Sequence, residues 1–184
     1  LDKIKGIIYN HRLSSDEYYM QAFTNLLCLV DSLQLEIGPD NMPIVYFTNP
    51  SGKDFQIERI RPYFRQISLE TQGEYYNFLK SDKVQLHINS FMESKGMWSM
   101  STVEAGATGN ACLLPYKFGY SEIFNRSYRG YCSDLEEMKW KLLELFKNSE
   151  KAAQYDNFSL LVHSNKVVGN QLNKKLERVR KTHG

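Results

Sequence analysis

The sequence predicts a three-layer α/β domain, with a mostly parallel sheet of about six strands between helices and a C-terminal helical tail. Three observations support this fold class. Short apolar segments alternate with segments of helical period along most of the chain, which is typical of strands buried on both faces of a parallel sheet. The length of 184 residues suits one domain of this kind. Beyond Ser133 and Asp134 the pattern becomes helical only.

Strands are expected where a short apolar run, often rich in β-branched residues, is bounded by polar or turn residues. Such runs are found at 4–9, 43–48, 65–69, 84–88 and 111–115. Asn10, Asn49 and Asn89 follow three of these runs and favour their termination. A last, shorter strand is expected within 128–131.

Helices are expected where apolar residues recur every three or four positions. The main ones cover 17–35, 74–81, 101–108 and 135–146. The first begins after Ser14 and Asp16, which are N-cap residue types, and ends before Gly38, while Gly109 closes the third. Shorter helical turns are expected at 57–64 and 120–124, and the tail carries helical patterns near 152–162 and 167–181.

Composition excludes several classes of protein. The balance of 23 Lys and Arg against 21 Asp and Glu gives no sign of a protein that binds nucleic acid mainly through charge. No apolar run approaches the roughly 20 residues that span a bilayer. Because the charged start is not a signal peptide, we expect a cytoplasmic protein, or one in the host cytoplasm if its source is viral. The cysteines are too widely spaced for a zinc site and are expected to be buried, reduced thiols: Cys28, Cys112 and Cys132.

In a parallel sheet the ligand lies at the carboxyl ends of the strands, so a binding crevice is expected there. Arg12 directly follows the first strand, and its guanidinium fork suits phosphate oxygens, although it could instead cap a turn or pair with Asp16. The helix beginning near Ser101 offers free N–H groups to an anion. Glu104, one turn inside that helix, either holds sugar hydroxyls or merely complements the helix dipole.

Several segments together resemble one known family: Glu74-Tyr75-Tyr76, 84–88, 103–109, Leu113-Leu114-Pro115 and 120–124. They resemble the C-terminal domain of two-domain, GT-B-fold retaining glycosyltransferases of the group 1 superfamily. Within it they are most similar to the branch that contains the queuosine-tRNA mannosyltransferases. His11-Arg12 after a strand is similar to the superfamily's Arg at the start of this domain. The resemblance covers roughly residues 4 to 148.

The resemblance implies a Rossmann-like domain over 4–148 that binds a nucleoside-diphosphate sugar, UDP- or GDP-hexose, and a helical extension over 149–184. Arg12 would contact the diphosphate in catalysis, and Glu104 would hold the ribose hydroxyls. The other donor-binding residues that it implies are His11, Ser68, Leu69, Trp98, Ser99, Met100, Ser101 and Thr102. No metal or cofactor is expected, because Arg12 and the helix start could stabilise the leaving phosphate.

Two positions depart from the family pattern. Gly96 stands eight positions before Glu104, where the family has a Glu, and Glu93 takes that catalytic role only if the loop is rearranged. Glu17 stands about where the family has a Lys on the diphosphate. The candidates for a replacement cation are Lys53, Lys95 and Lys117.

The chain begins without Met, almost directly on a strand, which indicates a fragment that lacks its N-terminal acceptor-binding domain and is inactive alone. The resemblance implies hexose transfer with retention, to DNA or tRNA as acceptor. The basic stretch 174–181 could contact phosphates or be a solvated helix face. Two alternatives stay open: a catalytically inactive binding or scaffold domain, and another α/β protein, such as a sugar-nucleotide epimerase or a phosphate-binding domain.

Overall fold

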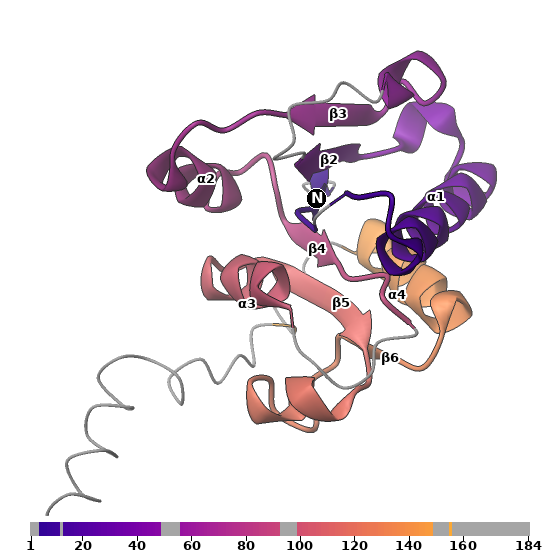
Figure 1. Ribbon diagram of the computed structural model, residues 1–184. Coiled ribbons are helices and arrows are strands. Elements are labelled where there is room, and N and C mark those ends of the chain that lie inside the picture. Colours follow the sequence, from indigo (N-terminus) through magenta and orange to yellow (C-terminus); the bar gives the residue numbers. More distant parts are fainter. Residues whose placement is uncertain (1–3, 12, 49–55, 93–98, 149–154, 156–184) are drawn as a thin grey trace, which may run out of the picture.

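A computed structural model of the protein describes residues 4–11, 13–48, 56–92, 99–148 and 155. Its strands form one six-stranded sheet in the order β3-β2-β1-β4-β5-β6, and each neighbouring pair runs parallel (Figure 1). The strands are β1 (Gly6–Tyr9), β2 (Ile44–Thr48), β3 (Phe64–Ile67), β4 (Leu86–Ile88), β5 (Ala111–Pro115) and β6 (Tyr131–Cys132). The strand order reverses between β1 and β4, which is where open α/β sheets place their ligand crevice.

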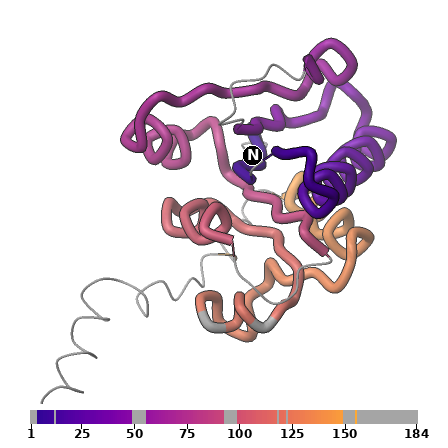
Figure 2. The backbone as a smooth tube through the Cα atoms, in the orientation of Figure 1, coloured from indigo at the N-terminus to yellow at the C-terminus, as the bar shows by residue number. Residues whose placement is uncertain are grey.

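In the part of the chain that the structure describes, four α-helices cover the sheet: α1 (Glu17–Ile37), α2 (Gln72–Leu79), α3 (Met100–Ala107) and α4 (Leu135–Lys147). Helices α1 and α4 lie together on one face, and α2 and α3 lie on the other (Figures 1 and 2). Short 3₁₀ helices lie in the connections at Pro39–Asn41 (η1), Ile57–Arg59 (η2) and Phe118–Glu122 (η3).

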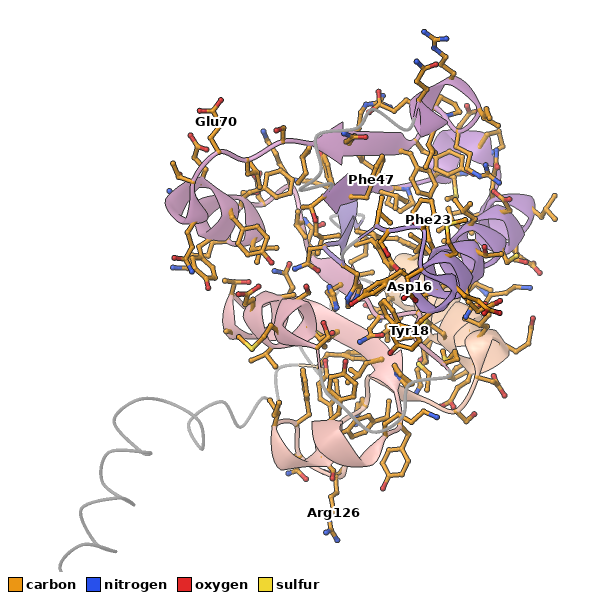
Figure 3. All side chains as sticks on the ribbon, viewed as in Figure 1. Asp16, Tyr18, Phe23, Phe47, Glu70 and Arg126 are labelled. Atoms are coloured by element: carbon orange, nitrogen blue, oxygen red, sulfur yellow. The ribbon has the colours of Figure 1, made fainter. Side chains whose placement is uncertain are left out.

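The pleat of β1 explains how both layers are held. Ile7 belongs to the large buried cluster that includes Leu26 of α1, whereas Ile8 packs with Leu79 of α2. Successive side chains of a strand point to opposite faces, so one apolar strand anchors a helix on each side. Figure 3 shows Phe23 and Phe47 between the sheet and α1.

Side chains define where the helices begin. Asp16 accepts a hydrogen bond from the N–H of Tyr18, at 2.9 Å, and starts α1. Thr71 and Glu74 form a reciprocal capping box at the start of α2. Gly38 ends α1 with a φ of 81°, a conformation that favours glycine.

The predicted fold class, a three-layer α/β domain with a parallel sheet, is confirmed. The element boundaries shift by a few residues, most clearly at the last strand, which is β6 rather than 128–131. Tyr128 instead turns its buried ring inward, where its hydroxyl accepts from the N–H of Cys112 and donates to its carbonyl. The helical patterns predicted near 152–162 and 167–181 lie outside the described residues.

The expectation that all three cysteines are buried is wrong for Cys28. Cys112 and Cys132 are buried, but Cys28 is exposed. It lies on the solvent side of α1, because the helical period turns Leu26, Leu29 and Val30 toward the sheet instead. Within the described part of the chain, no helix is both long and apolar enough to cross a membrane.

Candidate functional site

A cleft of about 440 Å³ opens where β1, β2 and β3 end and α2 and α3 begin. Its lining includes Asn10, Thr48, Ser68, Leu69, Tyr75, Ser101 and Glu104. The crevice expected at the carboxyl ends of the strands is therefore present. Four of the residues predicted to bind a donor come together in it: Ser68, Leu69, Ser101 and Glu104.

The carboxylate of Glu104 is held by two tyrosines of α2. The hydroxyl of Tyr75 donates to Oε2 at 2.9 Å, and the hydroxyl of Tyr76 donates to Oε1 at 3.2 Å. Each carboxylate oxygen can accept a second hydrogen bond. The half-buried Glu104 thus presents two neighbouring acceptors to the cleft, an arrangement that suits the paired hydroxyls of a sugar.

The first turn of α3 lies beside this carboxylate. Ser101 donates its hydroxyl to the carbonyl of Asn10 at 2.8 Å, which ties the helix start to the end of β1. Ser99, the N-cap, makes no capping bond with its side chain, and no partner is recorded among the described residues for the N–H groups of Met100 and Ser101. These groups and the helix dipole favour an anion.

A buried network holds the start of α3 from below. Asn89 donates its side-chain amide to the hydroxyl of Thr102, at 3.0 Å, and to that of Tyr120. Tyr120 also accepts from the N–H of Ser99 at 3.0 Å, and His87 shares a 3.0 Å hydrogen bond with Thr102. Thr102 is completely buried, so the structure gives it a part in fixing the helix start and no place in the lining of the cleft.

His11 is buried as well, with only 3% of its surface exposed, and it does not line the cleft. Its Nδ1 lies 3.3 Å from the hydroxyl of Ser99, and its ring lies 5.1 Å from that of His87. Burial lowers the pKa of His11 to about 3, so the side chain is neutral at physiological pH. The structure thus places His11 in the packing under the site, behind Ser99.

The other residues predicted to form the site are either exposed away from the cleft or lie outside the described part of the chain. Met100 is exposed and does not line the cleft. Arg12, Glu93 and Trp98 lie outside the described residues, as do Lys53, Lys95 and Gly96.

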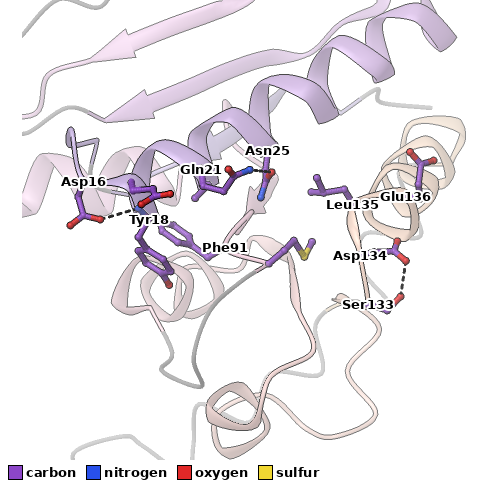
Figure 4. A pocket seen from close by; sticks show the side chains of 12 residues that line it. Asp16, Tyr18, Gln21, Asn25, Phe91, Ser133, Asp134, Leu135 and Glu136 are labelled. Carbon is purple, nitrogen blue, oxygen red and sulfur yellow. Dashed lines mark hydrogen bonds between the residues drawn. The ribbon is translucent and has the colours of Figure 1, made fainter.

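A second, larger cavity of about 1120 Å³ lies between the N-termini of α1 and α4 (Figure 4). Carboxylates from both helices line it: Asp16, Glu17, Asp134 and Glu136. Tyr18 and Phe91 form an aromatic wall, with their ring centroids 4.8 Å apart. The four carboxylates make this cavity a poorer site for a phosphate than the cleft, whose described lining carries two, Glu70 and Glu104, beside the open start of α3.

Among the described residues, no group of three or more His, Cys, Asp or Glu side chains could hold a metal ion. Three contributors to the cleft were not identified as site residues from the sequence: Asn10, Tyr75 and Tyr76. Asn10 stands at a strand end, which is the signal that could have identified it. Tyr75 and Tyr76 were noted only as part of the family resemblance. Nothing in their spacing indicates that they contact a helix nearly thirty positions away.

A scan of protein-family profiles and a search of curated protein sequences each gave no match. Solved structures do match. TarM has a TM-score of 0.65 at 15% identity over 93% of this chain, and a complex of an S. aureus TarM mutant with fondaparinux, alpha-GlcNAc-glycerol and UDP scores 0.62 at 16% identity over 92%. This chain spans only 35% of TarM in both structures.

The C-terminal domain of LpcC, a glycosyl transferase group 1 family protein from Francisella tularensis, matches over most of both chains. It has a TM-score of 0.57 at 16% identity, and the match covers 88% of this chain and 86% of that domain. At such identities the likeness shows the fold. The protein therefore has the fold of the C-terminal domain of a group 1 glycosyltransferase.

Proposed function

We propose that the chain is the donor-binding domain of a retaining glycosyltransferase of the GT-B type, and that its cleft binds a nucleoside-diphosphate hexose. One observation carries the proposal: Glu104 and the open first turn of α3 share a cleft at the carboxyl edge of the sheet. The fold shared with a group 1 glycosyltransferase domain supports it, as does the UDP in a TarM complex.

Each part of the nucleotide has a chemically suitable partner in this proposal. Glu104 accepts hydrogen bonds from the ribose hydroxyls, and Ser68 and Leu69 lie near the base. The N–H groups at the start of α3, together with Arg12, stabilise the negative charge that builds on the leaving diphosphate. No step in this scheme requires a metal ion. Either UDP or GDP as carrier is compatible with these contacts.

The acceptor site belongs to a second domain in this proposal, because the chain spans only 35% of TarM. The surface at the carboxyl edge supports the idea. Exposed apolar side chains gather after β1, β4 and β5, as expected where another domain packs: Tyr18, Met20, Met100 and Tyr116. The N-terminal domain is proposed to cover this edge, supply the acceptor and complete the active site, in which Glu93 also takes part.

A nucleic-acid base or nucleoside, in DNA or tRNA, is our proposed acceptor, and it rests on the resemblance to the queuosine-tRNA mannosyltransferase branch. The described edge carries the acidic cavity between α1 and α4, so phosphate contacts have to come from the basic stretch 174–181 or from the other domain. Reversal of the charges in 174–181 of the intact enzyme tests this. Transfer to tRNA or DNA should fall and its salt dependence should flatten. An unchanged salt dependence contradicts a role for this stretch.

An inactive binding domain is a second candidate, favoured by Glu17. This residue lies in the first turn of α1, next to Asp16, where the superfamily pattern has a cation for the diphosphate. Two carboxylates there weaken diphosphate binding by repulsion. Under this candidate, the chain binds nucleotide weakly and the full-length protein transfers no sugar.

Calorimetry with UDP-, GDP- and ADP-sugars tests the donor-binding proposal. One of these nucleotides should bind, and Glu104→Ala and Arg12→Ala should each reduce its affinity about tenfold or more, since each removes a hydrogen bond to a charged group. Glu136→Ala is a control, because it removes a carboxylate from the other cavity. The absence of binding to every nucleotide, by this chain and by the full-length protein, contradicts the proposal.

A further inference from the structure

The tyrosine pair that holds Glu104 is built to orient its carboxylate. Tyr75 and Tyr76 are neighbours in α2, and each donates to a different oxygen of Glu104, at 2.9 Å and 3.2 Å. Two donors on two oxygens fix the plane of the carboxylate as well as its position. Since each oxygen accepts two hydrogen bonds, one acceptor site on each stays available to a ligand.

Asn10 determines the direction in which the hydroxyl of Tyr75 donates its hydrogen bond. Its side-chain nitrogen lies 3.2 Å from the carbonyl of Ser101, and a carbonyl only accepts, so the amide is oriented with its N–H groups on that side. The same amide group donates to the hydroxyl of Tyr75. Because Tyr75 Oη already accepts this bond, its single proton is directed to Glu104.

The tyrosines are themselves held in place. Their rings pack against the buried cluster of Ile8, Leu79 and Val84, with centroids 5.4 Å apart. Burial is the main reason why the pKa of Tyr75 is raised, so its hydroxyl stays protonated and remains a donor. Asn10 is 93% buried and lines the cleft, so the amide that directs the Tyr75 hydroxyl is itself held in one place.

We propose that Tyr75 and Tyr76 are positioning residues that orient Glu104 toward two adjacent hydroxyls, and that the cleft therefore selects ribonucleotides over 2′-deoxyribonucleotides. The inference rests on the proposed donor-binding function and deepens it. A nucleotide with both ribose hydroxyls satisfies both free acceptor sites of the carboxylate. A 2′-deoxynucleotide leaves one of these sites without a ligand partner, and a buried acceptor without a partner is costly.

The test compares UDP, GDP and ADP with their 2′-deoxy counterparts by calorimetry on the 184-residue chain. The wild type should bind the best ribonucleotide about tenfold more tightly than its 2′-deoxy form. In Tyr75→Phe and Tyr76→Phe the affinity for the ribonucleotide should fall about fivefold, whereas that for the 2′-deoxynucleotide changes less than twofold. Tyr46→Phe is the matched control, because its ring packs on Phe78 and does not line the cleft.

The selectivity distinguishes positioning from a general structural role. If a variant damaged the fold, its affinities for the ribonucleotide and the 2′-deoxynucleotide would fall together, and its melting temperature would fall too. If it only loses the orientation of Glu104, the preference for the ribonucleotide falls and the melting temperature stays the same. This inference is overturned if the wild type binds the ribonucleotide and its 2′-deoxy form equally well. It is also overturned if the double variant Tyr75→Phe/Tyr76→Phe keeps the wild-type preference for the ribonucleotide. Neither result contradicts the proposal that the chain binds a donor nucleotide. If none of the nucleotides binds to the wild-type chain or to the full-length protein, the proposed function itself fails.

Discussion

Two histidines lie side by side under the candidate site, and both are held neutral by their surroundings. Their ring centroids are 5.1 Å apart, and only 3% of His11 and 0% of His87 are exposed. Burial lowers the pKa of His11 to about 3, and burial is the main cause that lowers the pKa of His87 well below its ordinary value. Buried neutral groups of this kind make the stability of the fold depend on pH.

The protein should lose stability as the pH falls from 7 to 5. In this window the unfolded chain binds a proton at each histidine, near a pKa of about 6.5, while folded His11 stays neutral. Stability is therefore present above the unfolded pKa and lost below it, by about 2 kcal/mol for His11 alone between pH 7 and pH 5. Urea unfolding at several pH values measures this loss.

His11→Gln is the informative variant, because it cannot titrate. Its stability should fall less steeply with acidity than that of the wild type. The carboxyls with a lowered pKa, Asp31 beside Arg61 and Glu137 beside Lys141, act at lower pH and do not contribute in this window. Parallel pH curves for the variant and the wild type would contradict the assignment.

At this scale the sequence predicted the position of Glu104 correctly, but it did not predict the groups that hold it. Glu104 could be placed because a helix that follows a buried strand begins at the carboxyl edge of the sheet. Its contact with Tyr75 and Tyr76 depends on how α2 and α3 pack side by side, which no spacing encodes. His11 shows the converse, since the family resemblance implied a ligand contact for it and the structure buries it.

The helices that form the cleft are defined by their caps. Thr71 accepts from the N–H of Glu74 at 3.2 Å, and Glu74 accepts in return from the N–H of Thr71, also at 3.2 Å. This capping box fixes the first turn of α2, which ends at Tyr75. The placement of the tyrosine pair therefore depends on a local sequence signal.

Thr71→Ala should lower the free energy of unfolding by about 1 kcal/mol, because it leaves an N–H at the helix start without its partner. Thr24→Ala is the control. Its hydroxyl donates only to the carbonyl of Met20 on the exposed side of α1, so the effect should stay within about 0.5 kcal/mol. Equal losses in the two variants, measured by urea unfolding, would show that the capping box contributes nothing special.

The strand β6 depends on a glycine at its start. A Cβ at Gly130 would collide with the carbonyl of Cys112 and with the ring of Tyr128. Gly130→Ala should therefore destabilise the fold by about 2 kcal/mol or more, through overpacking.

Gly73→Ala provides the opposite case in α2. The nearest atom to its Cβ, Oγ1 of Thr71, lies 3.9 Å away, so the substitution should stabilise the helix by about 0.5–1 kcal/mol. Thermal unfolding of both variants checks the pair. A Gly130→Ala protein as stable as the wild type would contradict the packing described around β6.

Element boundaries were predicted less well than element types, and β6 shows why. A strand was expected within 128–131, but the hydroxyl of Tyr128 makes hydrogen bonds to the main chain of Cys112, so the Tyr128 side chain packs against β5. The two residues of β6 that pair with β5 are determined by how the whole sheet assembles, and the local sequence does not show them. The long helix α1 was predicted to within a few residues, because its caps and its period agree.

In the whole molecule, one edge of the sheet gathers the features that suggest function. The cleft beside Glu104, the acidic cavity between α1 and α4, and most of the exposed apolar side chains follow strand ends. Figure 3 shows Arg126 pointing away from the body of the protein. The two cavities differ in their number of carboxylates and in the open helix start beside Glu104, and we propose that only the cleft beside Glu104 binds a nucleoside diphosphate.

Hydrogen exchange with and without UDP, GDP or ADP tests this proposal most directly. If the cleft is the nucleotide site, the bound nucleotide should slow exchange of the amides at 68–71 and at the start of α3, Ser99 to Val103. The amides around the acidic cavity, at 16–18 and 134–136, should exchange as before. Protection at the acidic cavity, or no protection anywhere at nucleotide concentrations that saturate binding, would contradict the assignment of the cleft.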